Sequence, residues 1–283
     1  MLLHRLVSNC GVALIDPMRL ELLPVCDAFP LTPAGFQNEA HLMPLCIRLD
    51  ALAPRDQDAL AQWIDEYVCA ADDPPALMFA ESECAFDRLL GHLRQLLILR
   101  MADRRRCLFR YYDPSVFRHV DWIFDDAQRA AIHGPVARFC YWDGHTWREA
   151  CKPEVQPAAR VSPDADQSAR LGRVSALNSL LASCDIPRDS ESRVALCKDI
   201  DGYLGRAQAK GWRDEADWEA FAERCLNCHR RFDEHPRVVC MLEQAAEDDC
   251  AFSDVVRSVD QGFWDLVSAE LSATDVTTMR VSK

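Results

Sequence analysis

The chain of 283 residues lacks the motifs by which most enzymes and membrane proteins are recognised in sequence. It has no G-x-S-x-G, no H-E-x-x-H and no glycine-rich phosphate-binding loop. With ten glycines in total, loops built for a close approach to phosphate are not expected. No run of 18 or more apolar residues is present, so no membrane-spanning helix is expected either. The sequence therefore predicts a protein that is not an enzyme, uses no cofactor and does not act in a membrane.

The N-terminus lacks the features of an export signal. Residues 1–17 start with apolar side chains, but polar residues interrupt them and no small-residue cleavage site follows. The 14 cysteines would suggest disulfides in a secreted protein, yet they are scattered singly through segments with helix and strand patterns. In a reducing compartment cysteine behaves as a small buried apolar residue. We therefore expect a cytoplasmic protein.

Positive charge is scarce and evenly spread. Up to residue 150 there are 15 arginines against 21 acidic residues, and after it 17 basic against 24 acidic residues, which leaves −6 and −7 of the formal net charge of −13. Nucleic-acid binding depends on clustered cations that neutralise phosphates, so no nucleic-acid partner is expected. The densest basic run is Arg104-Arg105-Arg106. We interpret it as a solvated turn between two strands, with a site for an anion or a partner as the alternative.

The first half alternates between short apolar runs and amphipathic stretches. The apolar runs predict strands at 11–16, 45–50, 76–79, 96–101, 107–112, 136–142 and 145–150. Helical spacing predicts a helix over 54–70, a second capped by Ser82, and a third that begins at Asp113-Pro114. Residues 27–43 are expected to form a loop, because they contain two prolines and a glycine.

The second half is expected to be helical throughout. Residues 152–170 hold three prolines among polar residues, which is typical of a linker. Beyond it, apolar residues recur at helical spacing in segments too short to be stable singly, which predicts a bundle of four or five helices. The sequence therefore predicts an α+β protein: a mixed α/β domain with a small mixed sheet (1–151), a linker (152–170) and an all-α helical bundle (171–283).

One motif has the spacing of a cofactor site. Cys225-Leu226-Asn227-Cys228-His229 matches the pattern for covalent haem attachment, but that chemistry belongs to exported proteins. Cys225 and Cys228 also lie on the apolar stripe of their helix, which favours core cysteines. A zinc site is the alternative, with ligands from Cys225, Cys228, His229, His235 and Cys240. We predict no metal and no haem here.

A charged pair surrounds the start of the third predicted helix. Asp113 precedes a proline at a helix start, which is typical of a capping residue. Arg110 would share a strand face with Leu108 and Tyr112, and if that face is buried it needs an acidic partner. Asp113 or Glu81 would serve as that partner. We interpret Arg110 and Asp113 as structural, with a partner contact as the alternative.

Several segments, in this order and spacing, resemble one family: the effector chaperones or adaptors encoded beside the spike (VgrG) genes of type VI secretion clusters. The segments are Leu14-Ile15-Asp16-Pro17, His41-Leu42-Met43-Pro44-Leu45, His92-Leu93-Arg94, Leu108-Phe109-Arg110-Tyr111-Tyr112-Asp113-Pro114 and Gly134-Pro135. The resemblance covers about residues 10–140. It departs from the family where a Trp-Gly pair is common and this chain has Pro75-Ala76-Leu77.

The resemblance implies a non-catalytic adaptor that binds a cognate effector and the VgrG spike protein in the cytoplasm and helps to load one onto the other. The family-motif positions, which we expect to be structural, are His92, Arg94, Phe109, Arg110, Asp113 and Pro114. Three alternatives stay open: an immunity protein that neutralises a toxin, a hydrolase with an unrecognised site, and a haem or redox protein.

Overall fold

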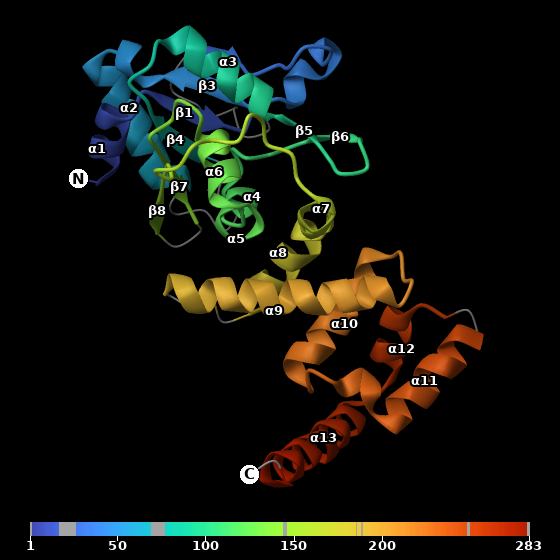
Figure 1. Ribbon diagram of the computed structural model, residues 1–283. Helices are drawn as coiled ribbons and strands as arrows, with labels where there is room; N and C mark the ends of the chain where they lie inside the picture. The colour runs from blue at the N-terminus through green and yellow to red at the C-terminus, as the bar shows by residue number, and fades with distance from the viewer. Residues whose placement is uncertain are drawn as a thin grey trace. The chain divides into compact units, whose positions relative to one another are not determined.

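A computed structural model describes residues 2–16, 27–68, 77–143, 146–184, 186–187, 189–247 and 250–281 (Figure 1). The chain divides into two compact units, Met1–Leu171 and Gly172–Lys283. Some predicted features lie outside the described residues: Pro17 and Pro75-Ala76 of the family resemblance, the end of the first predicted helix at 69–70, and residues 144–145 between and at the start of the predicted hairpin strands.

The first unit is built on a sheet of six strands in the order β2-β3-β1-β4-β7-β8. Their bounds are β1 Val12–Ile15, β2 Ala28–Pro30, β3 Leu45–Arg48, β4 Leu77–Glu81, β7 Arg138–Trp142 and β8 Trp147–Cys151. All four residues of β1 are buried, as suits a central strand. The predicted α+β class is confirmed, and so is the hairpin of β7 and β8.

The prediction of a mixed sheet is wrong, because every strand pair in the described sheet is antiparallel. Alternating strands and helices are typical of parallel crossovers. Here β3 and β4, which flank helix α2 (Pro54–Trp63), do run in the same direction. However, β1 lies between them and pairs with both in the opposite sense. β2 is a further correction, since it lies within the loop expected at 27–43.

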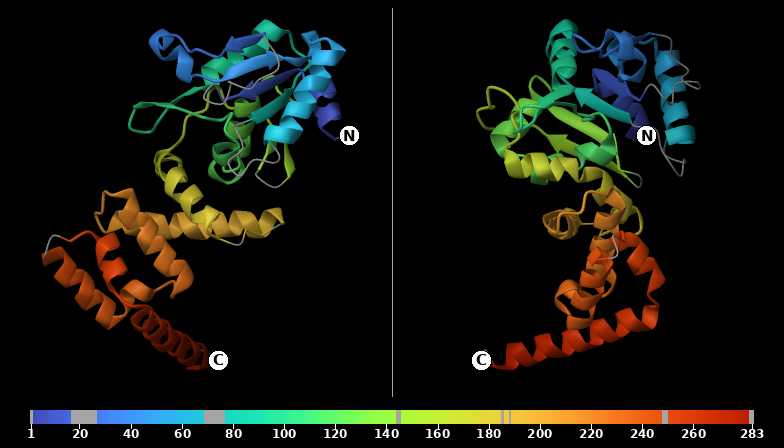
Figure 2. Two further views of the ribbon diagram at one scale, coloured as in Figure 1. Left: turned by 180° about the vertical axis from the view of Figure 1, so that it is seen from behind. Right: turned by 90° about the vertical axis from the view of Figure 1, so that its right-hand side faces the viewer.

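Helices cover both faces of this sheet (Figure 2). One face packs against α1 (Leu2–Asn9) and α2 through a cluster that includes Leu6, Val7, Leu60 and Phe79. Helix α2 begins at Pro54, as predicted, and continues as a π-helical turn over Ile64–Val68. The other face carries Phe139 and Tyr141, whose rings contact Phe117.

Helix α3 (Phe86–Leu96) begins later than predicted. Its N-cap is Ala85, and the hydroxyl of Ser82 donates instead to the carbonyl of Pro135 at 2.8 Å. Strands β5 (Ile98–Arg100) and β6 (Arg106–Leu108) follow as a separate hairpin. The strand expected at 107–112 therefore ends at Leu108.

The helix predicted from Asp113 is divided. α4 (Pro114–Phe117) and α5 (Val120–Ile123) are each one turn long, and α6 (Asp126–His133) follows with a capping box between Asp125 and Gln128. The predicted apolar stripe is still buried at Phe117, Val120, Ile123 and Phe124.

Residues 152–170, expected as a linker, lie within the first unit and are bonded to it. The backbone amides of Lys152 and Ala158 donate to the carbonyls of Ala137 and Ala127. α7 (Ala165–Gly172) then begins, and the buried amide of Gln167 donates to the carbonyl of Ile123 at 3.0 Å. The predicted division into two domains joined by a linker stays a prediction.

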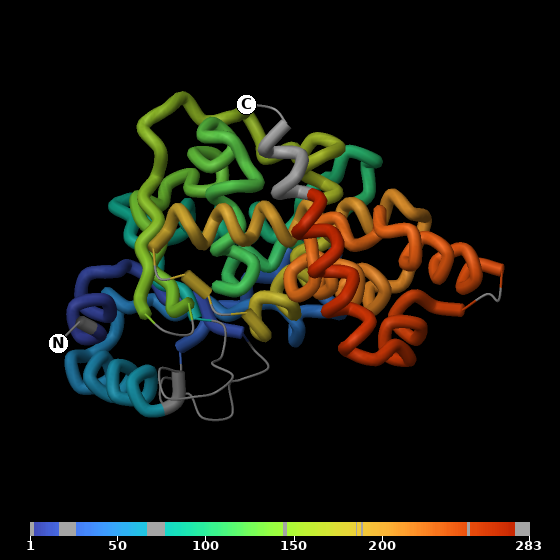
Figure 3. Tube along the Cα trace, turned by 90° about the horizontal axis from the view of Figure 1, so that it is seen from below, coloured from blue at the N-terminus to red at the C-terminus, as the bar shows by residue number. Residues whose placement is uncertain are grey.

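The second unit is helical, as predicted, and its helices follow one another in yellow to red in Figure 3. Its described part holds six helices in place of the expected four or five: α8 Val174–Ala182, α9 Ser190–Ala209, α10 Glu215–Asn227, α11 Pro236–Glu247, α12 Phe252–Ser258 and α13 Gln261–Val281. Its core contains Phe221, Phe232, Phe252 and Trp264. Trp212 stacks on Phe252 with ring centroids 4.6 Å apart.

A buried ion pair joins α8 to α9. Arg173 donates from Nε and Nη2 to the carboxylate of Asp201 at 2.7 and 2.9 Å, and from Nη1 to Gln208 at 3.0 Å. Both side chains of the ion pair are less than a tenth exposed. The bidentate geometry satisfies groups whose burial without a partner would be strongly unfavourable.

Candidate functional site

The family-motif residues meet around α3. The ring of His92 covers Gly134, and its Nε2 lies 2.9 Å from the carbonyl oxygen of Ile132. A carbonyl only accepts, so Nε2 carries the proton. Burial lowers the pKa of His92, which keeps the ring neutral. The H-L-R and G-P segments of the resemblance are therefore in direct contact.

Arg94 lies two residues further along α3 and reaches the sheet. Its Nη2 donates to the carbonyl of Pro30, at the end of the edge strand β2, over 3.4 Å. This contact was not predicted, because residues 28–30 were expected to belong to a loop.

Phe109, Arg110, Asp113 and Pro114 form the turn that leads into α4. Phe109 is buried among aromatic rings. The carboxylate of Asp113 accepts from the amide of Ser115 at 2.9 Å, and Pro114 is the first helical residue, so the predicted capping geometry is present.

Arg110 differs from the prediction in two ways. It follows the end of β6 and is about half exposed, with 47% of its side chain accessible. It pairs with Asp16 at 3.1 Å and with Asp113 at 3.2 Å. Glu81, the other partner considered, pairs with Arg138 at 2.7 Å. All six motif positions therefore make contacts within the first unit.

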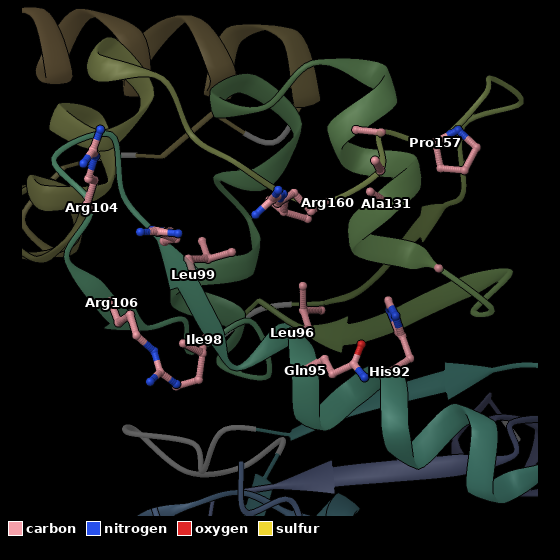
Figure 4. A pocket seen from close by; sticks show the side chains of 15 residues that line it. His92, Gln95, Leu96, Ile98, Leu99, Arg104, Arg106, Ala131, Pro157 and Arg160 are labelled. Atoms are coloured by element: carbon pink, nitrogen blue, oxygen red, sulfur yellow. The ribbon is translucent and has the colours of Figure 1, made fainter. Parts of the chain in front are cut away.

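A cavity of about 750 Å³ opens beside His92, a volume suited to a small ligand or a short peptide segment. It lies between the end of α3, strand β5 and the coil at 157–161. In the view of Figure 4, Arg160 lies between the arginines of the hairpin at one end and His92 at the other. The wall includes the apolar side chains of Leu96, Ile98, Leu99 and Val161.

Four arginines line this cavity: Arg100, Arg104, Arg106 and Arg160. All four are exposed, and none forms an ion pair with a residue that the structure describes. No acidic residue is among the described residues of the wall. Arg105, by contrast, points to Asp103 and pairs with it. The predicted turn at 104–106 is present, and two of its three arginines belong to the cavity.

The cysteine–histidine motif lies in the second unit. Cys225 is buried against Phe221, and burial raises its pKa to about 12. The thiol of Cys228 donates to the carbonyl of Trp264 at 3.3 Å. His229 accepts from the amide of Arg231, and His235 contacts Glu270 at 2.8 Å. Cys240 is exposed.

These side chains do not converge on one point. In the described part of the chain, no group of three His, Cys, Asp or Glu residues is arranged to hold a metal ion. Among the same residues, no helix is long and apolar enough to cross a membrane.

Comparison with known proteins gives one result. No curated protein and no solved structure matches the chain. Residues 31–131, which run from the end of β2 into α6 and contain the six motif positions, match the model of a family described as "Domain of unknown function (DUF4123)".

Proposed function

We propose that the protein is a non-catalytic adaptor of type VI secretion, which binds a cognate effector in the cytoplasm and helps to load it onto the VgrG spike. The observation that carries the proposal is that the region matched by the family model contains the main segments of the resemblance. The family model covers residues 31–131, and the same stretch contains the H-L-R and L-F-R-Y-Y-D-P segments that resemble the effector adaptors.

The contacts of the motif residues support a structural rather than a catalytic role. His92 donates a hydrogen bond to a backbone carbonyl, Asp113 caps helix α4, and Arg110 forms ion pairs with two carboxylates. A hydrolase would instead hold a nucleophile and a base within hydrogen-bond reach of each other at an open site. We therefore propose a binding role and no turnover.

The test uses the full chain in its native cytoplasm. The tagged protein is expressed from its own locus, purified, and its bound proteins are identified by mass spectrometry. We expect VgrG together with one large effector. A strain that lacks the VgrG gene serves as the control, and in it the effector should still be recovered.

Two results would contradict the proposal. Recovery of a toxin without VgrG would favour an immunity protein, because such a protein binds the toxic domain and has no need of the spike. Loss of the gene should also lower the amount of effector in the medium while the spike is still exported. Unchanged export of the effector would show that the protein does not load it.

A further inference from the structure

The cavity beside His92 lies along β5, which pairs only with β6 in the described part of the chain. All three residues of β5 line it. Consecutive side chains of a strand point to opposite faces of the sheet, so a cavity on one face would meet only every second residue. Because all three consecutive residues of β5 line this cavity, we infer that it lies along the edge of the strand. Another part of the wall is the coil at 157–161.

The register of the hairpin shows which backbone groups face this edge. Met101 donates to the carbonyl of Arg105, and Phe109 donates to that of Leu97. Hydrogen-bonded pairs alternate in an antiparallel ladder, so Leu99 pairs with Cys107 and the backbone groups of Ile98 and Arg100 point away from β6. β5 thus offers an edge to which another strand can bind.

The charge of the cavity is opposite to that of the chain. Four arginines that form no ion pair with any described residue line it, in a protein with a net charge of −13. Guanidinium groups bind carboxylates in a bidentate manner, and Leu96, Ile98 and Val161 supply an apolar wall between them.

Arg104 provides an independent observation. Its φ of +70° is the only positive value among the described residues other than glycine. The position follows a turn closed by the amide of Arg104 and the carbonyl of Met101, and in such hairpins it is usually filled by glycine. Arg104 therefore adopts a backbone conformation that disfavours any residue with a Cβ, and it lines the cavity.

We propose that this cavity binds an extended acidic segment of a protein partner. The segment pairs with the edge of β5, its carboxylates bind Arg100, Arg104, Arg106 and Arg160, and an apolar side chain between them packs on the wall. The identification of the partner as the effector or the spike rests on the proposed function, whereas the chemistry of the segment does not. A nucleic acid is disfavoured because the whole chain would repel its phosphates.

The probe is a display library of random dodecapeptides, selected on the purified full-length protein. We expect enrichment of peptides that alternate Asp or Glu with apolar residues. The best peptide is then synthesised with a fluorophore and titrated by fluorescence polarisation. Two N-methylated versions of this peptide are then compared, one methylated on the odd-numbered backbone amides and one on the even-numbered amides. Only one of the two should lose binding, because only every second amide of a paired strand faces β5.

Two variants test the arginines. Arg100→Glu combined with Arg160→Glu should weaken binding of the peptide at least about tenfold, as expected for lost charge-assisted hydrogen bonds. The matched control combines Arg5→Glu with Arg55→Glu, which reverses the charge of two exposed arginines on α1 and α2, and it should leave binding of the peptide unchanged. Arg104→Gly should also weaken binding while it raises the melting temperature, so unfolding cannot explain the loss.

Enrichment without acidic residues, equal binding by the cavity and control variants, or preferential binding of a single-stranded oligonucleotide would each overturn the proposal. These outcomes are separate from those of the proposed function. If the wild-type protein recovers VgrG and effector and the Arg100/Arg160 variant recovers them equally, only the cavity proposal fails. If the peptide binds but the wild-type protein recovers neither, only the adaptor function fails.

Discussion

The imidazole of His92 occupies the space that a side chain on Gly134 would fill. A Cβ built on Gly134 would lie 2.2 Å from Cε1 and 2.5 Å from Nε2 of that ring. Gly134 also has a φ of +54°. Two segments more than forty residues apart in the sequence therefore depend on each other: the ring needs the glycine, and the glycine permits the close approach of α3 to the end of α6.

This contact predicts that Gly134→Ala destabilises the first unit by about 2–4 kcal/mol, through overlap and backbone strain together. Adding His92→Ala to this variant should restore the stability lost through overlap with the ring, but not the stability lost through the strain of a positive φ at residue 134. Chemical denaturation of the two single variants and the double variant measures this coupling. Strictly additive effects would show that the ring and the glycine are independent.

Arg104→Gly is predicted to stabilise the protein by about 0.5–1 kcal/mol. The left-handed conformation costs a residue with a Cβ roughly 1–2 kcal/mol, and the greater freedom of glycine in the unfolded chain offsets part of the gain. Arg105→Gly, at the neighbouring position with negative φ, is the control and should destabilise. A lower melting temperature for Arg104→Gly would contradict this account of the turn.

The buried ring of His133 predicts a loss of stability in acid. Burial lowers its pKa from 6.5 to about 4. Between these values the unfolded chain binds a proton that the folded chain does not, so stability falls as the pH falls from about 6.5 to 4. The effect amounts to at most about 3 kcal/mol.

His133→Phe keeps a ring against Phe139 and removes the titrating group. The free energy of unfolding of this variant should depend less on pH between 7 and 4 than that of the wild type. Two parallel curves would show that His133 does not carry the acid sensitivity.

The ion pair of Arg173 and Asp201 predicts a non-additive response in the second unit. Arg173→Met or Asp201→Leu should each destabilise by about 3–5 kcal/mol, because one buried charge is left without its partner. The double variant should be much closer to the wild type. Thermal unfolding followed by circular dichroism measures the stability of the three variants. A loss of stability in the double variant equal to the sum of the two single losses would show that Arg173 and Asp201 are not coupled.

The elements predicted well from sequence are those whose signals are local. The β7–β8 hairpin, the start of α2 at Pro54 and the cap of α4 at Asp113 each follow from a few neighbouring residues. The antiparallel order of the sheet did not follow, because the insertion of β1 between β3 and β4 is decided by long-range packing. The N-terminal helix α1 was also missed, since its residues were considered only as a signal segment.

The candidate site shows the same division. The arginine run at 104–106 was visible as a turn, and Arg100 joins it through the β5–β6 hairpin. Arg160 joins it only through the fold, from more than fifty residues further along the chain. Of the two partners predicted for Arg110, Asp113 is confirmed and Glu81 is wrong. Asp16, the second partner, lies too far away in sequence for any local pattern to indicate it. The run of three arginines, with a site for an anion or a partner as its alternative interpretation, was the one signal that pointed to the cavity.

The place of β1 has a consequence for the order in which the sheet forms during synthesis. β1 leaves the ribosome before both of its neighbours, β3 and β4, and the second of them is complete only at Glu81. The stretch of residues 31–131 contains those neighbours and lacks β1 itself, as well as β7 on the far side of β4. A fragment cut to the bounds of the family match would therefore lack the strand that joins β3 to β4, and we expect that it does not fold by itself.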